Sequence, residues 1–120
     1  MEHSKIWEQY VQSWKAETAE EKRVLFKQCM TENTVYTDPL TQTKGWDALI
    51  QYMLEFHQQI DGGHFVTTYF LSHHNKSMAK WNMCNRNGDV LGEGVSFGEY
   101  DHNGKLKAET GFFELPDQEG

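Results

Sequence analysis

Asp38 is the side chain in this sequence best placed to do acid–base chemistry. It ends an apparent strand over residues 35–38, and Pro39 follows it in a turn that leads to an amphipathic helix beginning near Gly45. A carboxylate at such a junction can point into a cavity that the helix covers, where burial raises its pKa and its basicity. That chemistry is the removal of a weakly acidic C–H proton, and the alternative is a solvated turn aspartate.

Two late strands could bring further polar groups to the same cavity. One of them has small residues on a single face at period two, which leaves room for a ligand or a packed helix: Gly92, Gly94, Ser96 and Gly98. The hydroxyl of Ser96 could donate a hydrogen bond. Glu109 shares a face with Gly111 and Phe113 on the final strand, and it is merely exposed if that face looks outward.

Three helices are predicted to hold these groups in place. The first covers residues 4–15, where Tyr10 lies on the apolar stripe and could either donate to an enolate or simply pack its ring. The second begins at the capping-box pattern 18–21 and ends near Met30, with a buried side made of Val24, Leu25, Phe26 and Cys29. The third follows the Asp38 turn, with apolar residues at helical spacing: Trp46, Leu49, Met53, Phe56 and Ile60.

Strand patterns follow over residues 64–72, 77–86, 90–100 and 105–115, with tight turns at Asn87-Gly88 and Asn103-Gly104. The order is helix, helix, strand, helix, and then a meander of four antiparallel strands. It predicts one α+β domain over residues 1–120, in which the helices cover one face of a curved sheet. A loose tail is expected from Pro116 onward.

Charge and composition narrow the function classes. The net charge is −7, with 11 Lys and Arg against 18 Asp and Glu, which argues against nucleic-acid binding. Cys29 and Cys84 are isolated, so we expect core packing in a reducing compartment, with the cytoplasm as the simplest location. No apolar run reaches the ~20 residues of a membrane span. The histidines at 64, 73 and 74 lack a tight ligand spacing, so no metal is expected.

The element order, the stretch 34–40, Gly45, the aromatic third helix and the closing Asn103-Gly104 strand together resemble the nuclear transport factor 2-like superfamily. Within it, the chain is most similar to the small SnoaL-like polyketide cyclases and the ketosteroid isomerases. The resemblance covers nearly the whole chain as a pattern, and it implies a cone-shaped curved sheet packed against three N-terminal helices. It also implies a homodimer, because the superfamily commonly pairs its sheets.

The resemblance also assigns roles to individual residues. Asp38 falls where the isomerases keep the aspartate that shuttles a proton beside a carbonyl, and Tyr10 falls where they keep the tyrosine of the oxyanion hole. Ser96 stands where they keep a protonated aspartic acid, and by the same resemblance Glu109 looks inward. The expected ligand is a small apolar or aromatic molecule, bound without a cofactor by mostly apolar side chains: Tyr36, Met53, Phe56, Trp81, Met83 and Phe113.

Two classes of function therefore remain open. One is an isomerase or ring-closing cyclase with Asp38 as its base. The other is a ligand-binding or association module on the same fold, which the missing acid at Ser96 favours. Epoxide hydrolysis fits less well, because Trp81, Met83 and Gly111 stand where the limonene epoxide hydrolases of the superfamily keep charged residues.

Overall fold

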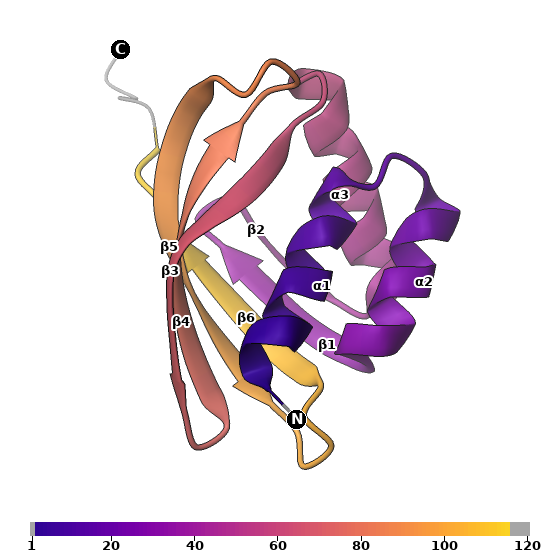
Figure 1. Cartoon of the computed structure of the whole chain (residues 1–120). Helices are drawn as coiled ribbons and strands as arrows, with labels where there is room; N and C mark the ends of the chain where they lie inside the picture. Colours follow the sequence, from indigo (N-terminus) through magenta and orange to yellow (C-terminus); the bar gives the residue numbers. More distant parts are fainter. Residues whose placement is uncertain (1, 116–120) are drawn as a thin grey trace.

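Residues 2–115, the part that this computed structural model describes, form three helices packed on one face of a curved six-stranded sheet (Figure 1). The expected loose tail lies outside these residues. The helices are α1 (His3–Lys15), α2 (Ala19–Cys29) and α3 (Trp46–Gln59). The strands are β1 (Met30–Asp38), β2 (Thr41–Lys44), β3 (His64–His73), β4 (Lys76–Cys84), β5 (Val90–Tyr100) and β6 (Leu106–Phe112). Within this range no helix is both long and apolar enough to cross a membrane.

The strands lie in the order β2-β1-β6-β5-β4-β3. The predicted four-stranded antiparallel meander is confirmed as β3 to β6. The sheet is nevertheless mixed, which corrects the prediction of a purely antiparallel one, because β1 runs parallel to β6. A short hairpin partner, β2, was also not predicted, and it forms because the turn after Asp38 folds the chain back to pair Asp38 with Thr41.

The helices bury the concave face of the sheet. On α1 the predicted apolar stripe is confirmed: Ile6, Trp7, Tyr10, Val11 and Trp14 are all buried. On α2 the hydroxyl of Thr18 accepts from the backbone N–H of Glu21 at 3.1 Å, as the capping pattern predicted. Val24 was predicted to be buried, but it is 57% exposed, and α2 buries Lys22 completely.

Lys22 is buried because its ammonium group joins the three helices. Its Nζ donates to the carbonyl oxygens of Ser13 (2.9 Å) and Ala16 (2.7 Å), which end α1. Nε2 of His57, from α3, lies 3.2 Å from the same Nζ. All three N–H donors of an ammonium group therefore have an acceptor when the imidazole is neutral. Burial lowers the pKa of Lys22 to about 8, and burial followed by the charge of Lys22 lowers the pKa of His57.

Replacing Lys22 with Met is expected to destabilise this junction. The carbonyl oxygens of Ser13 and Ala16 stay buried after the ammonium donor is removed, which costs about 1–3 kcal/mol. The measurement is the free energy of unfolding from urea titration near neutral pH. Lys27→Met, at an exposed position of the same helix, is the matched control. A Lys22→Met protein as stable as this control would contradict the role of Lys22 as the helix junction.

Candidate functional site

Asp38 is held by four hydrogen-bond donors at the end of β1. Its Oδ1 accepts from the backbone N–H groups of Leu40 (2.8 Å) and Thr41 (3.1 Å). Its Oδ2 accepts from the hydroxyls of Tyr36 (2.5 Å) and Tyr52 (2.8 Å). Four donors match the acceptor sites of an ionised carboxylate. Because Asp38 is only 8% exposed, it is a buried, fixed carboxylate rather than a solvated turn residue.

Glu109, on β6, is a second buried acid in a contrasting environment. It is 5% exposed, and its Oε1 has no hydrogen-bond partner among the described residues. Burial raises the pKa of Glu109 to about 8. The side chains of Ser96 and Tyr10 oppose this rise by hydrogen bonding, and the charge of Asp38 adds to it. Glu109 is therefore mainly a neutral carboxylic acid near neutral pH, and its face of β6 looks inward as predicted.

Gly111 brings the polar groups together. A Cβ built at this position would lie 3.3 Å from Oγ of Ser96, 3.8 Å from Cβ of Asp38 and 3.8 Å from Oε2 of Glu109. Ser96 is paired with Gly111 across β5 and β6, and it is 5% exposed. One small region inside the cone therefore holds a carboxylate, a carboxylic acid and a hydroxyl.

Tyr10 reaches the same region from α1. Its ring is 3% exposed, and its hydroxyl accepts from Nε1 of Trp14 at 2.9 Å. Burial, followed by the charge of Glu109, raises the pKa of Tyr10 well above its ordinary value. The hydroxyl of Tyr10 therefore keeps its proton and acts as a donor beside Glu109. The structure brings all four predicted catalytic side chains to one place: Asp38, Tyr10, Ser96 and Glu109.

The predicted ligand-binding residues divide into two groups. Tyr36 and Met53 are buried, at 6% and 0% exposure, and Met53 packs within the central core. The others are partly buried: Phe56, Trp81, Met83 and Phe113. Tyr36 is thus a partner of Asp38, whereas the side chains of the second group keep some exposure to solvent.

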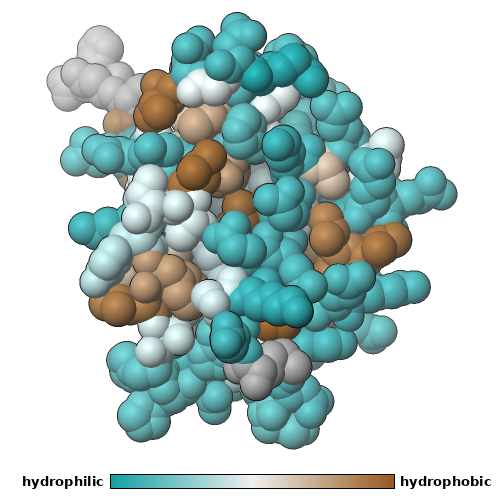
Figure 2. All heavy atoms as spheres, in the orientation of Figure 1, coloured by the Kyte–Doolittle hydropathy of each residue, from teal (hydrophilic) through white to brown (hydrophobic). Residues whose placement is uncertain are grey.

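Aromatic rings fill the space around the polar groups. Trp14 lies 6.1 Å from the ring of Tyr52, 5.4 Å from Phe56 and 5.2 Å from Phe65. Two surface hollows lie elsewhere, one beside the start of α1 and the other between α1 and α2, and neither is lined by Asp38 or Glu109. The visible face is mostly hydrophilic, with separate apolar spots (Figure 2). The carboxyl pair is therefore sealed from solvent by side chains.

Tyr52 and Trp14 belong to the site but were not predicted to do so. Tyr52 follows Leu49 by three residues and precedes Phe56 by four, so its helical spacing placed it beside the apolar stripe of the third helix. A tyrosine at that spacing, on the helix that covers an inward acid, was the available signal.

The chain matches no family model and no curated protein by sequence. Its structure is similar to a SnoaL-like family protein from Agrobacterium tumefaciens named as a candidate isomerase, with a TM-score of 0.85 and 27% identity over 94% of this chain and 97% of that one. It is also similar to a SnoaL-like polyketide cyclase candidate from Jannaschia (TM-score 0.74, 10% identity, 94% and 85% covered). A third similar structure is an NTF2-like protein of unknown function from Cytophaga hutchinsonii, with a TM-score of 0.71 and 11% identity over 95% of this chain and 91% of that one.

The fold and these similarities define the class of structure: an α+β cone with the fold of the nuclear transport factor 2-like proteins. Its structure is similar to those of SnoaL-like proteins, the resemblance that the sequence predicted.

Proposed function

We propose that this protein is a cofactor-independent enzyme that moves a proton next to the carbonyl group of a small, mostly apolar substrate, as an isomerase or ring-closing cyclase. The observation that carries the proposal is the pair of buried carboxyl groups, Asp38 with four donors and Glu109 with an unpartnered oxygen. Carboxyl groups in contrasting environments divide into an acid and a base. The names given to the Agrobacterium and Jannaschia proteins support the same reaction class.

In the proposed reaction, the hydroxyl of Tyr52 turns away from Oδ2 of Asp38, and this oxygen accepts the proton from the carbon beside the carbonyl group. The C–H bond breaks, and its electron pair moves into an enolate whose charge develops on the carbonyl oxygen. Glu109, which carries its proton, donates a hydrogen bond to that oxygen and stabilises the charge. Return of the proton from Asp38 to another carbon gives an isomer. Attack of the enolate carbon on a second carbonyl group forms a ring, and the resulting alkoxide takes the proton from Asp38. In this proposal Glu109 supplies the acid that hydrogen-bonds the enolate oxygen. The family resemblance had only Ser96 at the position of that acid.

The test is hydrogen exchange at the reacting carbon, which needs no knowledge of the natural substrate. Small aryl ketones are incubated with the protein in deuterium oxide, and NMR follows the loss of the α-hydrogen signals. The proposal expects exchange above the buffer rate for at least one ketone in the panel. Exchange at the buffer rate for every ketone, with folded protein, would contradict it.

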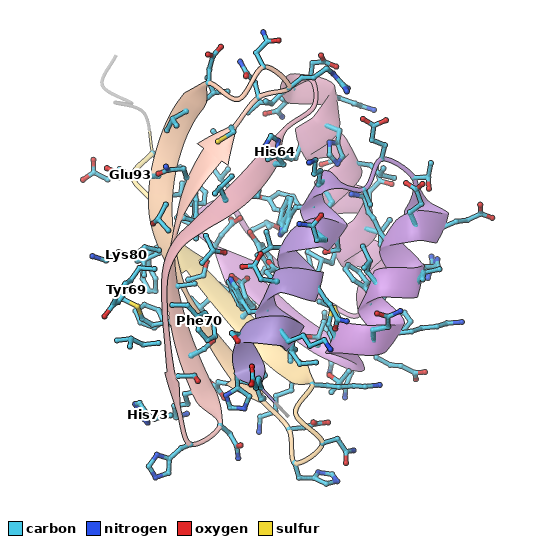
Figure 3. The ribbon with its side chains drawn as sticks, in the orientation of Figure 1. His64, Tyr69, Phe70, His73, Lys80 and Glu93 are labelled. Atoms are coloured by element: carbon cyan, nitrogen blue, oxygen red, sulfur yellow. The ribbon has the colours of Figure 1, made fainter. Side chains whose placement is uncertain are left out.

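A second candidate function is self-association through the outer face of the sheet, and an exposed apolar patch favours it. The patch consists of Tyr69, Leu71, Phe97 and Phe112, which are 45–54% exposed. Phe97 and Phe112 touch edge to face at 5.8 Å. Figure 3 shows Tyr69, Lys80 and Glu93 pointing away from the helices, so the face carries charges of both signs. A second copy of the chain, related by a two-fold axis, would cover the patch and oppose those charges.

Phe97→Glu is expected to dissociate this dimer, because a carboxylate would then face the partner's apolar patch without a counter-charge. Sedimentation velocity at micromolar concentration measures the change from a dimer to the 14.0 kDa chain. Val24→Glu, at an exposed apolar position on α2, is the control and should leave the dimer intact. A wild-type protein that sediments only as the monomer would overturn the proposal.

A further inference from the structure

Trp81 is a partly exposed aromatic side chain that is hydrogen-bonded to the serine beside the carboxyl pair. Trp81, on the inner face of β4, is partly exposed, whereas Ser96 and Glu109 behind it are 5% exposed. Nε1 of Trp81 donates to Oγ of Ser96 at 2.9 Å. Ser96 in turn stands beside Glu109, whose pKa it lowers by hydrogen bonding. The indole ring is therefore linked to the proposed reaction centre through a single hydroxyl.

The indole ring is seated on a glycine backbone. Trp81 pairs with Gly94 across β4 and β5. A Cβ at Gly94 would lie 2.4 Å from Cζ2 and 2.5 Å from Cη2 of the indole, so only glycine admits the ring at this depth. Phe65 and Phe113 flank the ring edge to face, at 5.0 Å and 6.1 Å. This is a slot shaped for a flat aromatic group, with a hydroxyl at its inner end that accepts a hydrogen bond.

We propose that Trp81 is a displaceable plug whose indole occupies the ligand's own position. The ligand that replaces it is a flat aromatic molecule of one or two rings with an N–H or O–H donor. It takes the place of the indole against Gly94 and forms the hydrogen bond to Ser96 that Trp81 gives up. The inference rests on the proposed function in treating the interior as a small-molecule site, and it adds both the entry route and the ligand class.

Indole itself is the probe, because it has the same ring and the same N–H donor as the side chain of Trp81. Trp81→Ala leaves an apolar slot of indole size, and such cavities bind matching aromatic molecules. Calorimetry is expected to show indole binding to Trp81→Ala at least about tenfold tighter than to the wild type, where it must compete with Trp81. N-methylindole, which lacks the donor, is expected to bind this variant about tenfold more weakly than indole. The further substitution Ser96→Ala should remove that difference.

A second measurement follows Trp81 in the wild-type protein itself. Heteronuclear NMR resolves the indole N–H groups of the four tryptophans, and Trp81→Phe assigns one signal. Excess indole should move the Trp81 signal and speed its exchange with solvent, while the signals of Trp7, Trp14 and Trp46 stay in place. A Trp81 signal unchanged at saturating indole, or no indole binding to folded Trp81→Ala, would overturn the inference.

These outcomes are separable from the fate of the proposed reaction. If indole displaces Trp81 while no ketone exchanges its α-hydrogens, the plug stands and the enzyme proposal fails. If ketones exchange while the Trp81 signal is unmoved by indole, the reaction stands and the plug fails.

Discussion

Glu109→Gln is expected to remove most of the pH dependence of stability between pH 5 and pH 8. Burial raises the pKa of Glu109 from 4.5 to about 8 in the folded protein, so the folded chain binds a proton that the unfolded chain has released. The contribution of Glu109 to the free energy of unfolding is therefore largest below pH 4.5, and it is lost as the pH rises towards 8. One pKa unit corresponds to about 1.4 kcal/mol, so the full loss is about 5 kcal/mol. Glutamine keeps the shape of the acid and cannot ionise.

Urea titrations at intervals between pH 5 and pH 8.5 measure this profile. Glu93→Gln, at an exposed position on the outer face, removes an acid without removing a buried proton, and it should keep the wild-type slope. The free energy of unfolding of Glu109→Gln should change less with pH than that of the wild type or of Glu93→Gln. At pH 8 the Glu109→Gln protein should be more stable than the wild type. If the free energy of unfolding of Glu109→Gln changed with pH as steeply as that of the wild type, another group would carry the buried proton.

Asp38→Asn is expected to lower the rate of α-hydrogen exchange between about a hundredfold and ten-thousandfold, the range that a positioned base contributes. The amide is not basic enough to take a C–H proton. The substitution also replaces one carboxylate oxygen with an NH₂ group. This donor group must then face either the two tyrosine hydroxyls or the two backbone N–H groups that donated to Asp38. We therefore expect a stability cost of about 2 kcal/mol beside the loss of activity.

Stability and activity are separated by working well below the unfolding temperature of each variant, with circular dichroism to confirm the folded state. Asp47→Asn is the matched control, since Asp47 is an exposed acid in the first turn of α3. It should retain the wild-type exchange rate. A folded Asp38→Asn protein with undiminished exchange would remove Asp38 from the reaction and leave Glu109 as the only candidate base of the pair.

The inward-facing residues of the late strands were predictable because strand side chains alternate strictly. Small residues at period two identified the inner face of β5, and Ser96 is buried there beside Gly98. The same alternation put Glu109 on one face with Gly111 and Phe113, and the family resemblance implied that this face looks inward, where Glu109 is indeed buried. Aspartate before proline marked the turn, and the turn fixed Asp38 at the end of a strand.

Contacts between segments distant in sequence were not predictable in this way. The parallel pairing of β1 with β6 joins residues at opposite ends of the chain, and no local pattern encodes it. Apolar spacing favoured Val24 over Lys22 for the buried side of α2, because the carbonyl oxygens that attract Lys22 belong to the end of α1. The hydrogen bond from Tyr52 to Asp38 likewise depends on how α3 packs over the sheet.

The roles of the two acids depended on the same three-dimensional information. Asp38 was the expected site of a raised pKa, yet four donors surround its carboxylate, and Glu109 holds the buried proton. Sequence patterns located both acids, but the donors around Asp38 and the burial that raises the pKa of Glu109 both depend on the folded structure.

Infrared spectroscopy of the carboxyl groups tests whether Glu109 holds a proton near neutral pH, as the acid of the proposed acid–base pair. The structure predicts one protonated carboxylic acid near pH 7, with a C=O stretch that disappears as the pH rises through about 8. The band should be missing from Glu109→Gln and present in the control Glu93→Gln. A wild-type spectrum without a protonated carboxyl at pH 6 would contradict the acid and base assigned to this site.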